Sequence, residues 1–196
     1  RVAGEAGGGL VRTTMNGKHD VLEVFIDPKV FAPTEKALVE DLLRLNTAAF
    51  ERHGIQVVRE FDEQTPAVCV DRHKVLQILI NLIRNAKHAM EPVNERARSM
   101  VIRVTTASPD RVKISIRDNG IGIPMDHLPK VFNHGFTTKK DGHGFGLHSG
   151  ANAAKEMGGS LMGHSDGPGQ GAEFTLELPT TASARSAESP AAHGKL

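Results

Sequence analysis

Residues 72–90 read R-H-K-V-L-Q-I-L-I-N-L-I-R-N-A-K-H-A-M. Apolar side chains recur at intervals of three and four residues along this stretch, which predicts a long helix with one buried face. The buried face consists of Val75, Ile78, Leu79, Leu82, Ile83 and Ala86. Asp71 is a suitable N-cap just before the helix, and Pro92 limits the helix at its other end.

A polar stripe lies beside this buried face. It consists of Gln77, Asn81 and Asn85, and their spacing of four residues stacks the side chains on one side of a helix. Asparagine has only modest helix propensity, so two of them in the middle of a helix require a reason. On these residues alone, a solvated or internally satisfied polar edge is the favoured interpretation.

Shorter elements are predicted on both sides of the long helix. Upstream we expect a strand at 21–26, a helix capped by Thr34 and ending near residue 52, a strand at 55–61, and a short strand at 68–70 in which Cys69 is buried. Downstream we expect a hairpin of 101–106 with 112–117, a glycine-rich stretch at 119–144, a helix at 145–157, and a closing hairpin of 160–164 with 173–178. Because strands and helices do not strictly alternate, we predict an α+β fold, a two-layer α/β sandwich whose mixed, mostly antiparallel sheet has helices on one face.

Composition sets the domain limits and excludes several functions. We expect a linker or disordered segment at 1–20, one domain at 21–179, and a disordered tail at 180–196. The 24 Lys and Arg against 23 Asp and Glu argue against a large nucleic-acid footprint. No apolar run approaches the ~18–20 residues that span a bilayer, and no signal peptide is evident. We therefore expect a cytoplasmic domain without nucleic-acid or membrane contact of its own, within a full-length protein that is cytoplasmic or membrane-anchored.

The strand predicted at 112–117 leads into Asp118. Val112, Ile114 and Ile116 are in the core phase of this strand, and Asp118 continues that phase. A buried carboxylate is costly unless it accepts hydrogen bonds. The sequence N-G-I-G-I-P at 119–124 follows at once, and its glycines allow a sharp turn against which a flat ligand can lie. Two interpretations stay open: an Asx turn, or an acceptor for the exocyclic amine of adenine.

A second glycine cluster, G-H-G-F-G-L at 142–147, opens the next predicted helix. Backbone N–H groups at a helix start attract phosphate, and glycines allow its close approach. Thr137, Thr138, Lys139 and Lys140 lie just upstream, where they either neutralise a polyphosphate or form a solvated charged loop. The P-loop and dinucleotide-turn motifs are absent.

Together and in this order, the segments resemble the Bergerat-fold GHKL superfamily, specifically the ATP-binding catalytic domain of sensor histidine kinases. Residues 77–86 resemble the N box, 118–124 the G1 box, 131–139 (V-F-N-H-G-F-T-T-K) the F box, and 142–147 the G2 box. Residues 158–161 and 171–179 resemble the closing hairpin. The resemblance extends over about residues 34–179.

The resemblance implies a site for ATP and Mg²⁺ beneath a flexible ATP lid at 124–146. Asn85 is implied to coordinate Mg²⁺, and Asn81 is implied to be a second catalytic residue. Asp118 is implied to accept a hydrogen bond from the adenine amine. The implied ATP-binding residues are Asn85, Lys87, His88, Asp118, Gly120, Gly122, Ile123, Phe132, Phe136, Thr137, Thr138, Lys139, Gly142, His143, Gly144, Phe145, Gly146, Leu147, His148 and Thr175.

Two departures from the family pattern bear on the chemistry. His88 stands where many members have Lys or Arg, so phosphate contact there is open and is sensitive to pH. Asn81 stands where the hydrolysing relatives carry the Glu that activates water, and an amide cannot take a proton. The resemblance therefore implies slow hydrolysis.

The expected activity is transfer of the γ-phosphate to a histidine on a separate dimerisation and phosphoacceptor domain, with a response regulator downstream. We do not expect the acceptor histidine within this chain, because His19-Asp20 precedes a β-like stretch instead of lying in paired helices. The alternatives are a non-catalytic nucleotide-binding interaction module and an anti-sigma-type serine kinase, although Asn81 counts against the latter.

Overall fold

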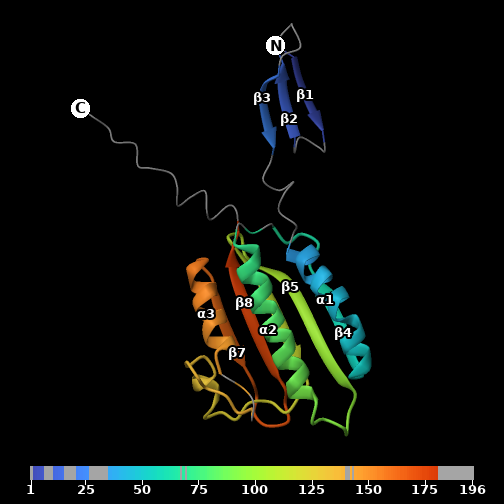
Figure 1. Ribbon diagram of the computed structural model, residues 1–196, viewed down its shortest axis with the longest axis vertical. Helices are drawn as coiled ribbons and strands as arrows, with labels where there is room; N and C mark the ends of the chain where they lie inside the picture. The colour runs from blue at the N-terminus through green and yellow to red at the C-terminus, as the bar shows by residue number, and fades with distance from the viewer. Residues whose placement is uncertain are drawn as a thin grey trace, which may run out of the picture.

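The computed structural model describes residues 2–6, 11–15, 21–26, 35–66, 68, 70–139, 142 and 144–180. Its largest part is a five-stranded sheet in the order β4-β5-β6-β8-β7, with three helices on one face (Figure 1). The strands are β4 (Ile55–Phe61), β5 (Arg98–Ser108), β6 (Arg111–Asp118), β7 (Ser160–His164) and β8 (Ala172–Pro179). The helices are α1 (Glu35–Arg52), α2 (Arg72–Met90), α3 (Gly146–Glu156) and the 3₁₀ turn η2 (Leu128–Lys130).

The pairing confirms the predicted fold class. β4 lies parallel to β5, whereas β5–β6, β6–β8 and β7–β8 are antiparallel, so the sheet is mixed and mostly antiparallel. Both predicted hairpins are present, as β5–β6 and β7–β8. None of the described helices combines the length and the hydrophobicity needed to cross a bilayer.

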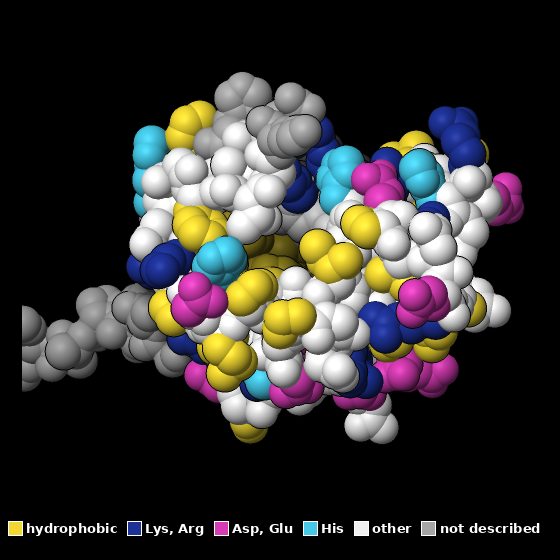
Figure 2. Space-filling model, turned by 90° about the horizontal axis from the view of Figure 1, so that it is seen from below, with side chains coloured by type: hydrophobic (Ala, Val, Ile, Leu, Met, Phe, Trp, Pro, Cys, Tyr) yellow, Lys and Arg dark blue, Asp and Glu magenta, His cyan; other side chains and the backbone are white. Residues whose placement is uncertain are grey.

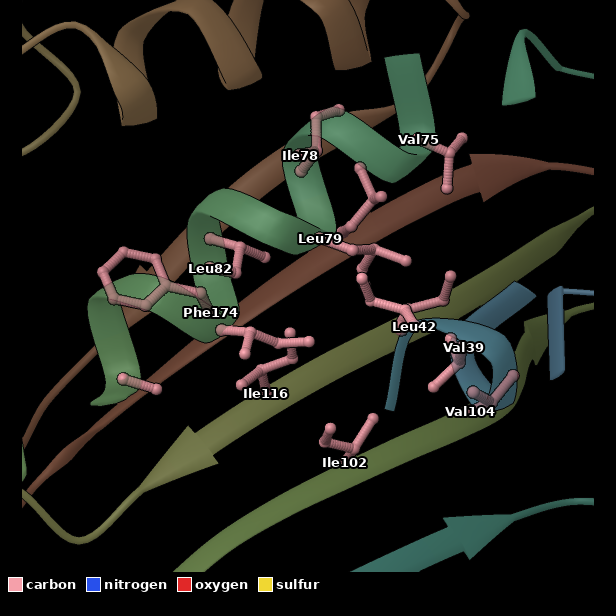
Figure 3. Close-up of a cluster of buried hydrophobic side chains, with 14 of the residues drawn as sticks. Val39, Leu42, Val75, Ile78, Leu79, Leu82, Ile102, Val104, Ile116 and Phe174 are labelled. Atoms are coloured by element: carbon pink, nitrogen blue, oxygen red, sulfur yellow. The ribbon is translucent and has the colours of Figure 1, made fainter. Parts of the chain in front are cut away.

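The core lies between the helices and the sheet. All six residues predicted for the buried face of α2 are buried. Figure 3 shows Leu82 of α2 near Ile116 of β6 and Phe174 of β8, while Val39 of α1 lies near Val104 of β5. Asp71 caps α2 as predicted, because its Oδ1 accepts the backbone N–H of His73 at 2.9 Å and of Lys74 at 3.3 Å.

The opposite face of the sheet is charged, which explains why helices cover only one face. Arg103 of β5 contacts Glu60 of β4 at 2.6 Å, and Lys113 of β6 lies 3.8 Å from Glu177 of β8. Such exposed pairs contribute little stability each. They make this face polar, so nothing needs to pack against it.

The expectation for the N-terminal residues was wrong in part. Residues 1–20 were expected to be a linker or disordered, but β1 (Val2–Ala6) and β2 (Val11–Met15) form an antiparallel sheet with β3 (Val21–Ile26). The strand predicted at 21–26 therefore pairs with β2 and not with the five-stranded sheet. A glycine run between two stretches that contain Val and Thr is a hairpin signal as well as a linker signal.

Two smaller expectations concern the ends of the main sheet. Of the strand predicted at 68–70, Val68 forms an isolated bridge with Thr180, whereas Cys69 lies outside the described residues. Of the tail predicted at 180–196, Thr180 is buried and paired, so the boundary was wrong by one residue; 181–196 lie outside the described residues, and their predicted disorder stays a prediction.

Two leucines on helices allow the core to be tested with a matched pair. Leu79 of α2 is 1% exposed and Leu45 of α1 is 84% exposed. We expect Leu79→Ala to lower the free energy of unfolding by about 2–5 kcal/mol because it leaves a cavity. Leu45→Ala should change it by no more than about 0.5 kcal/mol. Urea unfolding measures both, and equal effects would contradict this assignment of the core.

Candidate functional site

A cavity of about 800 Å³ opens beside the C-terminal half of α2. Figure 2 looks onto this end of the molecule and shows a hollow with hydrophobic side chains at its floor and basic and histidine side chains near its rim. The cavity brings together residues from all four predicted boxes. The predicted residues that line it are Asn81, Asn85, His88, Asp118, Gly122, Ile123, Phe136, Thr137, Thr138, Lys139, Gly142, Gly144, Phe145, Gly146 and Leu147.

Other predicted residues lie off the cavity. These are Lys87, Gly120, Phe132, His148 and Thr175, while His143 is outside the described residues. Thr175 follows the buried Phe174, and alternation along β8 directs its side chain to the opposite face of the sheet. Phe132 packs edge-on against Phe174, with ring centroids 6.3 Å apart, so it supports the cavity lining from behind. The ring Nδ1 of His148 lies 3.0 Å from the carbonyl oxygen of Phe132 and thereby joins α3 to that support.

The cavity has further lining residues that the sequence analysis did not assign. They are Arg84, Ala89, Glu91, Pro92, Ile121, Pro124, His127, Val131, Ala172 and Phe174. Helical spacing was an available signal for Arg84, which lies three residues after Asn81 on α2. Strand alternation was the signal for Ala172 and Phe174. His127 and Val131, in the segment before α3, had no comparable signal, since that segment has no regular period.

Asp118 combines the two interpretations that the sequence left open. Its Oδ1 accepts the backbone N–H of Gly120 at 2.8 Å, which is an Asx turn, and the same side chain lines the cavity. The residue is 4% exposed. Burial raises the pKa of Asp118 to about 6, although hydrogen bonds from the backbone of Gly120 and Ala172 oppose that rise. The carboxylate is therefore a buried acceptor, largely ionised at neutral pH.

The glycines after Asp118 are required by neighbouring protein backbone. A Cβ on Gly120 would lie 2.5 Å from the carbonyl oxygen of Ala89, and the next residue, Ile121, donates its N–H to that same oxygen at 2.9 Å. Gly122 has φ +70°, and a Cβ there would lie 2.1 Å from the carbonyl oxygen of Gly167. The turn at 119–122 is thus held between α2 and the loop that joins β7 to β8. The sharp turn expected of these glycines is present, and the close approach that they allow is to protein backbone.

Asn85 and Lys139 meet inside the cavity. The Lys139 ammonium donates to Asn85 Oδ1 at 2.8 Å across a sequence separation of 54 residues. The pKa of Lys139 is lowered, first by burial and then by the charge of Arg84, while Glu91 opposes the shift. An amide oxygen of the α2 polar stripe therefore already has a cationic partner.

Asn81 lies against the start of α3. A Cβ on Gly146 would lie 2.3 Å from Asn81 Oδ1, so a larger residue there would displace the Asn81 amide from its place beside the start of α3. The Asn81 Nδ2 is buried and has no hydrogen-bond partner among the described residues. Such a donor is costly unless something pairs with it. Together with the N–H groups at the start of α3, it makes this corner of the cavity suited to an anion.

Positive side chains outnumber negative ones at the polar end of the cavity. Arg84 and Lys139 line it, and Glu91 is the carboxylate of the lining on the same side. The Glu91 Oε2 lies 3.1 Å from the Nδ1 of His88, and this hydrogen bond lowers the pKa of Glu91. The cavity therefore has an apolar end with one carboxylate, Asp118, and a polar end suited to a polyanion.

A family model described as histidine kinase-, DNA gyrase B-, and HSP90-like ATPase matches residues 70–182. A second model, described as the YbaB/EbfC DNA-binding family, matches residues 1–53. This shorter segment contains seven Lys and Arg against eight Asp and Glu. It therefore lacks the basic excess that is typical of a nucleic-acid interface.

Curated relatives match over the main domain. Sensor protein FixL of Bradyrhizobium diazoefficiens is 32% identical over 142 residues, which are 72% of this chain and 28% of that protein. The signal transduction histidine-protein kinase AtoS of Escherichia coli is 35% identical over 144 residues, which are 73% of this chain and 23% of that protein. The chain thus spans about a quarter of the length of these relatives.

Solved structures of histidine kinases match about the same share of this chain as the curated relatives do. The nucleotide-free catalytic domain of histidine kinase ThkA has a TM-score of 0.66 and 26% identity, over 75% of this chain and 95% of that chain. Full-length ShkA in complex with AMPPNP also has a TM-score of 0.66 and 26% identity, over 76% of this chain and 30% of that chain.

The burial of Asp118 predicts how stability depends on pH. Because its pKa is raised from 3.8 to about 6, the native state loses stability as the pH rises through that range. Asp118→Asn removes the buried charge but keeps an acceptor for the Gly120 N–H. Relative to wild type, we expect this variant to gain up to about 3 kcal/mol between pH 4 and pH 8. Urea unfolding at both pH values measures the change, and a difference that does not vary with pH would contradict it.

Proposed function

Because the chain belongs to the histidine kinase-, DNA gyrase B-, and HSP90-like ATPase family and is related within it to sensor histidine kinases, we propose that it binds Mg-ATP in the cavity beside α2. We propose further that it transfers the γ-phosphate to a histidine on a separate dimerisation and phosphoacceptor domain. The observation that supports this most directly is that Asn85 and Asp118 line one cavity.

The adenine end of this proposed site is formed by Asp118 and apolar neighbours. The ionised carboxylate accepts the exocyclic amine of adenine, since each carboxylate oxygen can accept more than one hydrogen bond. Ala89, Ile123 and Phe174 also line the cavity and give the base an apolar surface to lie against. At pH values well below 6 the carboxyl is protonated and becomes a weaker, uncharged acceptor, so adenine binding should weaken.

The donor set at the polar end fits a magnesium ion held together with phosphate. Magnesium prefers oxygen ligands and usually keeps few protein ligands, with water and phosphate completing the octahedron. Among the described residues no group of three or more His, Cys, Asp and Glu could hold a metal. Asn85 Oδ1 is the proposed protein ligand, and it already accepts a cation, the Lys139 ammonium. When bound, the metal neutralises charge on the phosphates.

The remaining residues of the polar end position the phosphates. With a metal held by Asn85, Lys139 would be free to contact a phosphate oxygen, and the start of α3 would present its N–H groups. Asn81 cannot accept a proton, so it does not activate water for hydrolysis. The incoming imidazole of the acceptor domain is itself the nucleophile, which makes a strong base unnecessary. A response regulator would then receive the phosphoryl group.

The role of Asn85 predicts how nucleotide binding depends on metal. We expect Asn85→Ala to weaken ADP binding in Mg²⁺ by at least about tenfold, because the metal loses its protein ligand. Binding of ADP in EDTA should stay nearly the same. Calorimetry with and without Mg²⁺ measures both. Asn46→Ala on α1 is the matched control, since that amide donates to Leu42 within the helix at 2.8 Å. If Mg²⁺ strengthened ADP binding to Asn85→Ala as much as it does for the wild type, Asn85 would not be a ligand of the metal.

Phosphotransfer is tested with γ-labelled ATP and a separately produced acceptor domain from a sensor histidine kinase such as AtoS. We expect acid-labile label on the acceptor histidine, and loss of that label with Asn85→Ala. Nucleotide binding without any transfer, across several acceptor domains, would favour the non-catalytic module. Acid-stable label on serine would favour the serine kinase.

A further inference from the structure

Arg96 lies between the end of α2 and the start of β5, and its guanidinium group connects two separate loops. Its Nη2 donates to the carbonyl oxygens of Asn119 at 2.7 Å, Gly120 at 3.0 Å and Gly169 at 2.7 Å, and its Nε reaches Asn119 at 3.2 Å. A cationic donor makes such hydrogen bonds stronger than neutral ones. The planar fork of donors lets one side chain serve several carbonyls at once.

These carbonyls lie beside the part of the cavity lining formed by Asp118, Ile121 and Gly122. Asn119 and Gly120 follow Asp118 directly, and Gly169 lies in the loop between β7 and β8. Gly169 also donates its N–H to the carbonyl oxygen of Ile121 at 2.6 Å. The two loops are therefore joined twice, once by their own backbone and once through Arg96.

The contacted turn is also anchored by the side chain of Asn119. Asn119 Oδ1 accepts the backbone N–H of Ser99 at 2.9 Å, and Asn119 Nδ2 donates to Ala97 at 2.7 Å. Arg96 and Asn119 thus hold the turn to β5 and to the β7–β8 loop at once. Arg96 is not among the described residues that line the cavity, so it acts on a ligand there only through this backbone.

We infer that Arg96 is a positioning residue for recognition of the base. It fixes the turn at 119–122, so that the Asp118 carboxylate meets the exocyclic amine of adenine at a defined angle. This inference rests on the proposed nucleotide-binding function. It goes beyond that function by assigning base selectivity to a side chain outside the cavity.

Comparison of ADP with inosine diphosphate tests the inference, because inosine has a ring carbonyl where adenine has the amine. The wild type should prefer ADP. In Arg96→Ala we expect ADP to bind about tenfold more weakly, the equivalent of losing one charge-assisted hydrogen bond, whereas the affinity for inosine diphosphate changes by less than about twofold. Arg96→Lys keeps the positive charge but not the planar set of guanidinium donors, so this variant should also lose the preference for ADP over inosine diphosphate.

Arg111→Ala is the matched control. Arg111 stands at the other end of β6 and donates to the carbonyl oxygen of Gly158 at 2.6 Å, so it also ties a loop to the sheet. Calorimetry gives both affinities, and thermal unfolding of each variant shows whether it is folded. An unchanged ADP preference in Arg96→Ala, or full preference in Arg96→Lys, would overturn the positioning role while leaving the proposed function intact. A wild type that binds neither nucleotide would overturn both.

Discussion

The packing of α2 against β6 and β8 places the polar stripe of α2 and the carboxylate of Asp118 beside one cavity. The apolar side of α2 is fixed on the sheet by residues such as Leu82, which lies near Ile116 and Phe174 (Figure 3). Since the helical period is fixed, this packing also fixes the direction of Asn81 and Asn85. The strand period likewise fixes Asp118 at the end of β6. The position of the site thus follows from the geometry of the core. Its polar residues lie beside the buried face of α2 and at the end of β6.

Close backbone contact is the second constraint, and glycine meets it. Gly120 approaches Ala89 of α2, Gly146 approaches Asn81, and Gly171 approaches the backbone of Asp118, where a Cβ would lie 2.0 Å from the carbonyl oxygen. Each contact brings a loop or a helix start against α2 or β6. These glycines therefore let the elements around the cavity approach one another closely, and of the three only Gly146 lines the cavity itself.

Regular periods made much of the molecule predictable. The buried face of α2, both hairpins and the core phase of Asp118 follow from spacing alone, because burial on one side imposes a period of 3.6 or 2 on the sequence. Thr175 shows the limit of motif transfer, since its strand phase, which was visible in the sequence, places it on the opposite face. The contacts of Arg96 and the pairing of Lys139 with Asn85 had no such signal, because they join loops across long sequence separations.

The Lys139–Asn85 contact bears on the proposed metal site. Asn85 Oδ1 already accepts an ammonium group at 2.8 Å, so a divalent ion held there would exchange one cation for another at a fixed dipole. Lys139 would then be free to pair with phosphate. On the proposed function, the amide of α2 and the lysine of the segment before α3 would therefore change partners together.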